Sequence, residues 1–195
     1  ADSTFNPSRQ RLVVGTFLGG YAGTMTYLGL GWYANTDLGP FHFFDDGHEW
    51  LQMDKVGHSL GGYTTTRYLL GLENWAGASK KRALLYAGIG GFMAMNSIEV
   101  YDGFAVQWGA SLGDIGTNAA GVGLALGNEV LWEEQRIQLK FNYLPSPFVK
   151  VDSLQRLFGS NPAEWLLKDY NGQTYWLSFR VHSFLPEGSL KQTWP

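Results

Sequence analysis

Residues 52–62, with the sequence QMDKVGHSLGG, place a carboxylate, an ammonium and an imidazole at the start of a segment rich in glycine, leucine and threonine. In a helix, Asp54 and His58 stand four residues apart and therefore share one face. Gly57 and Gly61 repeat at the same spacing, which lets another helix approach closely. The segment predicts a helix whose polar stripe faces the interior of a helical protein.

Two later segments carry a similar combination. Asn96 and Glu99 lie three residues apart at the end of an uncharged run, residues 83–98, and Asp114 and Asn118 lie four apart at the head of residues 115–126. Three helices would then direct polar side chains to a common interior. The predicted polar network comprises Asp54, His58, Asn96, Glu99, Asp114 and Asn118.

Capping boxes indicate where two of these helices begin. Asp46 and Glu49 have the D-x-x-E form, which predicts a helix over about residues 47–70. Ser111 and Asp114 repeat the pattern before the last helix. Asp46 and Ser111 are therefore interpreted as helix caps and not as ligands.

A family resemblance rests on residues 54–58 (DKVGH), on Glu99 after an apolar helix, and on residues 108–121 (WGASLGDIGTNAAG), with further matches at 41–46, 131–136 and 168–178. These motifs resemble the YfiM-like family of predicted bacterial envelope proteins, and the longer Bacteroidota-type form looks closest. The resemblance implies an envelope address and no particular reaction, because the family carries no settled activity. Many relatives look like lipoproteins whose mature chain begins with cysteine, whereas this chain begins ADS.

The composition favours a membrane-associated protein. Charged residues make up 16% of the chain, below the roughly 25% of ordinary soluble proteins, while glycine (26 residues) and aromatic residues (15%) are abundant. A net charge of −3 without a basic cluster argues against a nucleic-acid partner. The absence of cysteine excludes disulfides and thiolate sites and is compatible with an oxidising periplasm.

Residues 12–34 contain no charged residue over 23 positions, enough for the roughly 20 residues that a bilayer-spanning helix needs. The alternative is a buried helix of a soluble bundle. Small residues at i,i+4 spacing in the predicted helices indicate close helix packing. These packing positions are Gly15, Gly19 and Gly23, then Gly57 and Gly61, then Ala119, Gly123 and Gly127.

After residue 135 the periodicity changes. Residues 136–143 and 174–182 alternate polar and apolar side chains, as half-buried strands do. Asn161 and Pro162 predict the start of a short helix that ends near residue 168. The predicted organisation is an N-terminal tail (1–11), a helical bundle (12–135) and a C-terminal extension (136–195).

Three roles for the polar residues stay open. Carboxylates and imidazole can hold zinc, manganese or iron, although no H-E-x-x-H pair is present and no cofactor is firmly predicted. They could instead be acid–base groups of a membrane-proximal enzyme acting on lipid or cell-wall material. The favoured hypothesis is a structural network, because polar groups inside an apolar bundle must be paired. In this network the buried carboxylates would pair with His58, Asn96 and Asn118, and with Lys55 or Arg67 as the cation. The candidate catalytic residues, which are also the candidate metal ligands, are Asp54, His58, Glu99 and Asp114.

The sequence as a whole predicts a mainly α-helical protein: a four-helix, glycine-rich, membrane-associated bundle with a small β-containing extension. We expect a non-catalytic subunit of a larger assembly in the outer membrane or periplasm. Its partners would be membrane lipid and other envelope proteins, an outer-membrane β-barrel being one candidate. Ala1 suits a mature end left by signal peptidase, and a trimmed chain would look the same. The sequence does not decide whether the native chain continues beyond Pro195, as similar proteins do.

Overall fold

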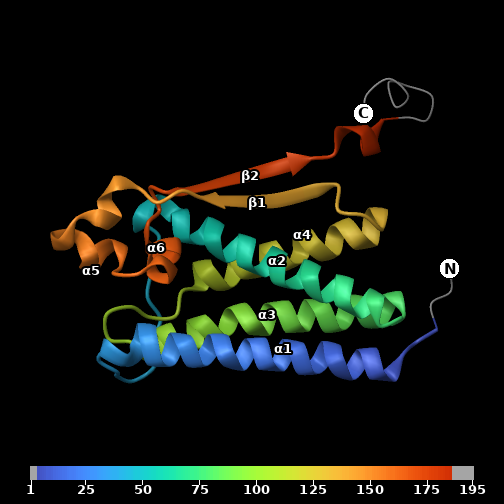
Figure 1. Cartoon of the computed structure of the whole chain (residues 1–195), viewed down its shortest axis with the longest axis horizontal. Helices are drawn as coiled ribbons and strands as arrows, with labels where there is room; N and C mark the ends of the chain where they lie inside the picture. Colours follow the sequence, from blue (N-terminus) through green and yellow to red (C-terminus); the bar gives the residue numbers. More distant parts are fainter. Residues whose placement is uncertain (1–3, 186–195) are drawn as a thin grey trace. The chain divides into compact units, whose positions relative to one another are not determined.

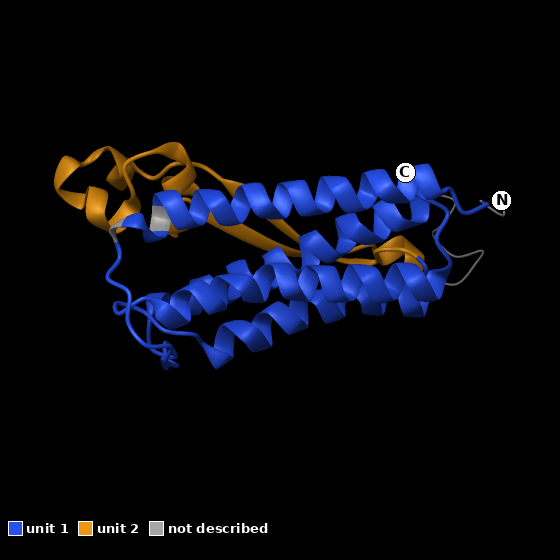
Figure 2. Ribbon diagram, turned by 90° about the horizontal axis from the view of Figure 1, so that it is seen from below, with its two compact units in different colours: residues 1–133 blue, residues 134–195 orange. Residues whose placement is uncertain are grey.

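The computed structural model describes residues 4–185, apart from the side chains of Trp32 and Asn35. The chain forms two compact units, Ala1–Glu133 and Glu134–Pro195, which Figure 2 shows in different colours. The described part is mainly helical and has one two-stranded antiparallel sheet near its C-terminal end. This confirms the predicted mainly α-helical chain with a β-containing extension.

The first unit contains four long helices (Figure 1): α1 (Pro7–Tyr27), α2 (Met53–Trp75), α3 (Lys80–Phe104) and α4 (Leu112–Trp132). Helix α2 packs against both α3 and α4. A core cluster joins Leu69 and Leu70 of α2 to Ala83 and Ala87 of α3. Helix α1 reaches α3 through Tyr21, whose hydroxyl lies 2.6 Å from the Ser97 hydroxyl.

Glycines bring the backbones of α2, α3 and α4 together. A Cβ at Gly62 would lie 2.5 Å from the backbone oxygen of Asn118, and one at Gly121 would overlap the backbone oxygen of Ser59. A Cβ at Gly91 of α3 would overlap the hydroxyl of Thr66 in α2. The close contact of α2 with α4 therefore needs glycine on both helices.

Most of the small residues at i,i+4 spacing do not lie at a contact between helices of the described chain. Gly61 lies against Met95, but a Cβ added at Gly15, Gly19, Gly23, Gly123 or Gly127 would meet no atom within 4 Å, and Ala119 is exposed. The reason is the orientation of each helix. Helix α1 turns Gln10 and Val13 inward, and α4 turns Asn118, Gly121 and Ala125 inward, so the repeated small residues face away.

Three predicted helix starts have different outcomes. Ser111 caps α4 as predicted, because its hydroxyl accepts a hydrogen bond from the backbone N–H of Asp114 at 3.1 Å. Asp46 is not a cap: α2 begins at Met53, after Leu51 and Gln52 adopt left-handed φ values of 51° and 61°. Residues 7–11 are helical and not a tail, because the Asn6 side chain caps α1 and Pro7 occupies its first turn.

The uncharged run 12–34, which was predicted to form one helix, is helical in the α form only up to Tyr27. Helix α1 stops at Tyr27, and the chain continues through one π-helical turn (Leu28–Trp32) and one 3-10 turn (Tyr33–Asn35). The run is therefore not one regular helix.

In the second unit, β1 (Ile137–Tyr143) pairs antiparallel with β2 (Gln173–Phe179), with Ile137 opposite Phe179. Between the strands lie the short helices α5 (Gln155–Phe158) and α6 (Pro162–Lys168). The predicted second strand ended at residue 182, but Val181–Phe184 form a 3-10 turn.

Asp169, which precedes β2, forms hydrogen bonds with the end of β1 and with the residues that follow it. Its fully buried carboxylate accepts hydrogen bonds from the Ser146 N–H and hydroxyl, both at 2.8 Å, and from the Tyr143 hydroxyl at 3.1 Å. Burial and this hydrogen bond raise the pKa of Tyr143 to about 12.

Candidate functional site

The polar residues gather at one end of the helical unit because α3 runs antiparallel to both α2 and α4. The first turns of α2 and α4 and the last turns of α3 therefore meet at this end, together with the loop before α2. This topology brings Lys55 and His58 of α2, Glu99 of α3 and Asp114 of α4 to one place. We call these residues, with Asp46, Asp54 and Ser111, the polar cluster.

Lys55 is the central cation of the polar cluster. Its buried ammonium forms ion pairs with Asp114 at 2.8 Å, with Asp54 at 3.1 Å and with Asp46. These carboxylates come from α4, from α2 and from the preceding loop, so one ammonium joins three segments. Asp54 and His58 share a helix face as predicted from their spacing, but the ion pair of Asp54 is with Lys55.

Asp46, which was predicted to cap a helix, belongs to this cluster instead. It accepts a hydrogen bond from the Ser111 hydroxyl at 2.8 Å in addition to its bond with Lys55. Partial burial by itself would raise the pKa of Asp46, but the hydrogen bonds from Lys55 and Ser111 outweigh it and hold the pKa below its usual value. The charged carboxylate thus ties the loop to the starts of α2 and α4.

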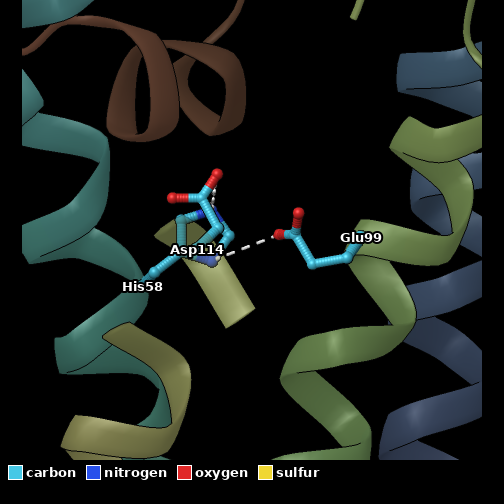
Figure 3. A group of neighbouring side chains, drawn as sticks. All are labelled: His58, Glu99 and Asp114. Carbon is cyan, nitrogen blue, oxygen red and sulfur yellow. Dashed lines mark ion pairs between the residues drawn. The ribbon is translucent and has the colours of Figure 1, made fainter. Parts of the chain in front are cut away.

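His58 lies between two carboxylates (Figure 3). Its Nδ1 is 3.6 Å from Oε1 of Glu99, and its Nε2 is 3.8 Å from Oδ2 of Asp114. Nδ1 is also 3.1 Å from the side-chain oxygen of Asn118. The amide group of Asn118 in turn reaches Asn96 at 3.4 Å, so five of the six predicted network residues form one connected set.

Glu99 is the most enclosed acid of this set, with 3% of its surface exposed. Its Oε2 accepts the backbone N–H of Ser111 at 3.0 Å. Its Oε1 has no hydrogen-bond donor among the described residues and faces His58. A buried carboxylate oxygen without a hydrogen bond is costly and therefore requires an explanation.

The sequence offered Lys55 and Arg67 as alternative cations for the buried carboxylates, and the structure places Lys55 among them. The hydrogen bond that Tyr33 donates to Asp102 at 2.6 Å was not predicted. Lys55 lies in the first turn of α2, at the start of a largely apolar segment, which was the signal available in the sequence. Tyr33 gave no such signal, since it lies at the end of an uncharged run.

Chemically, the polar cluster offers four carboxylates, one ammonium and one imidazole at the end of a glycine-packed helical bundle. Groups of this kind can pair with one another, hold a cation or transfer protons. The chain is therefore a helical protein with an acidic, imidazole-containing site at one end of its helical unit.

Residues 42–128 match the model of a family described as "Predicted periplasmic lipoprotein (DUF2279)". The matched segment contains every residue of the polar cluster. This family match confirms the predicted resemblance to an uncharacterised bacterial envelope lipoprotein family and supports a location in the cell envelope. Searches of curated proteins and of solved structures found no match.

Proposed function

We propose that this chain is a non-catalytic protein of the bacterial envelope whose helical unit lies in or against a membrane. The observation that carries the proposal is the apolar surface of α3. Large apolar side chains follow this helix on its exposed side: Leu85, Tyr86, Ile89, Phe92, Met93, Val100, Tyr101 and Phe104. Contiguous apolar surface of this extent favours contact with lipid or a partner.

Helix α1 extends this apolar surface. From residue 12 to its end it has no charged residue, yet most of its side chains are exposed, including Leu12 and Leu18. Arg9 and Arg11 at the start of α1 and residues 80–82 (KKR) at the start of α3 are basic. Uncharged helical stretches flanked by charged groups suit a lipid environment better than water.

Length supports the same proposal. The uncharged stretch of α3, residues 83–98, has 16 residues, or about 24 Å of helix, against a hydrocarbon thickness of about 30 Å. In the described part of the chain, Lys80–Phe104 is the one helix long and apolar enough to cross a membrane by length and composition, with 22% of that window buried. The sequence had pointed to residues 12–34 for this property, but glycine and threonine lower the hydropathy of that run.

The polar cluster then has a structural role: it fixes the ends of three helices. An apolar exterior gives α2, α3 and α4 little reason to adopt one relative orientation, because lipid competes with apolar contacts. The ion pair of Lys55 with Asp114 connects α2 to α4. Glu99, which accepts the backbone N–H of Ser111, connects α3 to the start of α4. No acid–base reaction is needed to explain the presence of these groups.

The hairpin of the second unit supports membership of a larger assembly. Among residues 4–185 the sheet consists of these two strands, so no third strand pairs with the second edge of either one, and Trp176, Leu177 and Phe179 of β2 are exposed. Open strand edges accept further strands. A β-rich envelope protein is the partner that this surface fits.

Membrane association is tested by carbonate extraction of native membranes. We expect the wild-type chain to stay in the pellet and the triple variant L85Q/I89Q/M93Q to shift to the soluble fraction. L144Q is the matched control, because Leu144 is equally apolar and exposed but lies in the other unit. Quantitative release of the wild type by carbonate would refute the proposal.

One observation favours a second candidate, a membrane-proximal enzyme. The Glu99 oxygen without a hydrogen bond lies beside His58, which is the arrangement expected of an acid–base pair. In that case His58→Ala would accumulate and fold normally while losing a defined activity on lipid or cell-wall material. Under the structural proposal the same substitution lowers stability and abundance.

A further inference from the structure

We propose that His58, Glu99 and Asp114 bind one divalent transition-metal ion, with zinc the ion that fits the ligands best. One ligand atom from each residue lies within 4.8 Å of the other two. The three residues come from α2, α3 and α4, so an ion here would join α3 to the two helices that the Lys55–Asp114 ion pair connects. The inference is independent of whether the apolar faces contact lipid.

Glu99 has a buried oxygen atom without a hydrogen bond. The residue is 3% exposed, and its Oε1 lacks a hydrogen-bond donor among the described residues while it faces Nδ1 of His58 (Figure 3). Its other oxygen is held by the Ser111 N–H at 3.0 Å, which prevents the side chain from turning away. A metal ion would satisfy the remaining oxygen.

Glu99 is the acid of the polar cluster that lacks a cation. Asp46, Asp54 and Asp114 surround the Lys55 ammonium, so that group of acids already has its cation. Glu99 has no lysine or arginine beside it among the described residues, and a divalent ion beside His58 would supply the missing positive charge.

Asn118 orients the imidazole of His58. The side-chain N–H₂ of Asn118 points to Asn96 at 3.4 Å, and its oxygen therefore faces Nδ1 of His58 at 3.1 Å. A carbonyl oxygen accepts hydrogen bonds, so Nδ1 is the donor of this contact, and Nε2, which faces Asp114, is the ring nitrogen left to bind an ion. Metal-bound histidines are oriented in this way by a hydrogen bond at the other ring nitrogen.

The ligand atoms have to move closer together to hold an ion. Tetrahedral ligands about 2.0 Å from zinc lie about 3.3 Å from one another. Nε2 of His58 is 3.8 Å from Oδ2 of Asp114, whereas Glu99 is 3.6 Å from the other ring nitrogen, Nδ1. One ligand atom of each residue lies within 4.8 Å of the other two, so a side-chain movement of about 1 Å is needed. One imidazole and two carboxylates are a ligand set used for zinc. Magnesium is a poor fit, because it prefers oxygen ligands only.

The test uses the full chain in mild detergent, purified without a polyhistidine tag and stripped with chelator. Zinc chloride is titrated by calorimetry, and bound metal is counted by mass spectrometry after dialysis. We expect one equivalent of zinc, no competition from magnesium, and binding at least about tenfold weaker in E99Q and D114N. D54N is the matched control, because Asp54 belongs to the cluster but not to the three ligands, and it should retain the ion.

Folding is separated from binding by two measurements. The E99Q amide oxygen can still accept the Ser111 N–H, so helix content of the chelator-treated variant should equal that of the wild type. Zinc should raise the melting temperature of the wild type and leave that of E99Q unchanged. Absence of zinc binding by the wild type, or unchanged zinc affinity in both E99Q and D114N, would overturn the inference.

Discussion

Two glycines of α4, two positions apart, provide the sharpest test of how the helical unit is held together. A Cβ at Gly121 would overlap the backbone oxygen of Ser59 and lie 2.8 Å from the backbone nitrogen of Tyr63, whereas one at Gly123 would meet nothing within 4 Å. We therefore expect Gly121→Ala to destabilise the unit and Gly123→Ala to leave it unchanged or stabilise it.

The magnitudes follow from packing and helix propensity. Overpacking against backbone costs typically 1–3 kcal/mol, and here the neighbouring atoms cannot rotate away, so the upper half of that range applies. Replacing an exposed helical glycine by alanine gains up to about 1 kcal/mol. The two variants should therefore differ by about 2–4 kcal/mol in the free energy of unfolding.

The assay is chemical denaturation in one detergent, followed by helix content, with both variants at equal concentration. In a thermal scan, a difference of this size corresponds to roughly 4–16 °C at about 2–4 °C per kcal/mol. Equal stability of the two variants, or a more stable G121A, would show that α2 and α4 do not pack backbone to backbone at this position.

Two further predictions concern the buried charges. Lys55→Met should lower the free energy of unfolding by about 3–5 kcal/mol, because it leaves buried carboxylates without their cation. Lys80→Met removes the more exposed ion pair with Glu133 and should have a far smaller effect. Equal losses of stability in denaturation experiments would contradict a buried role for Lys55. Asp169→Ala should separate β1 from β2, since the Ser146 N–H and hydroxyl lose their acceptor. Amide hydrogen exchange should become faster in β1 and stay unchanged in α2 to α4. If the β1 amides stay protected in this variant, Asp169 does not hold the two strands together.

Local signals in the sequence were sufficient for the elements themselves. The alternation in residues 136–143 predicted a strand, and Ser111 and Asn161 marked helix starts, because capping and side-chain periodicity depend on residues close together in the chain. The candidate residues of the polar network could be selected because polar groups at the ends of apolar helices need partners.

The partners of those residues were decided only by tertiary structure. Asp46 and Glu49 match a capping box, yet Asp46 pairs with Lys55 and Ser111 because the loop folds back over the starts of two helices. The spacing of small residues favoured Gly123 as a packing position, but it is Gly121 that meets α2, while a Cβ at Gly123 would meet no described atom within 4 Å. Small-residue spacing shows that a helix face can be approached closely, and only the position of the neighbouring helix determines which face is used.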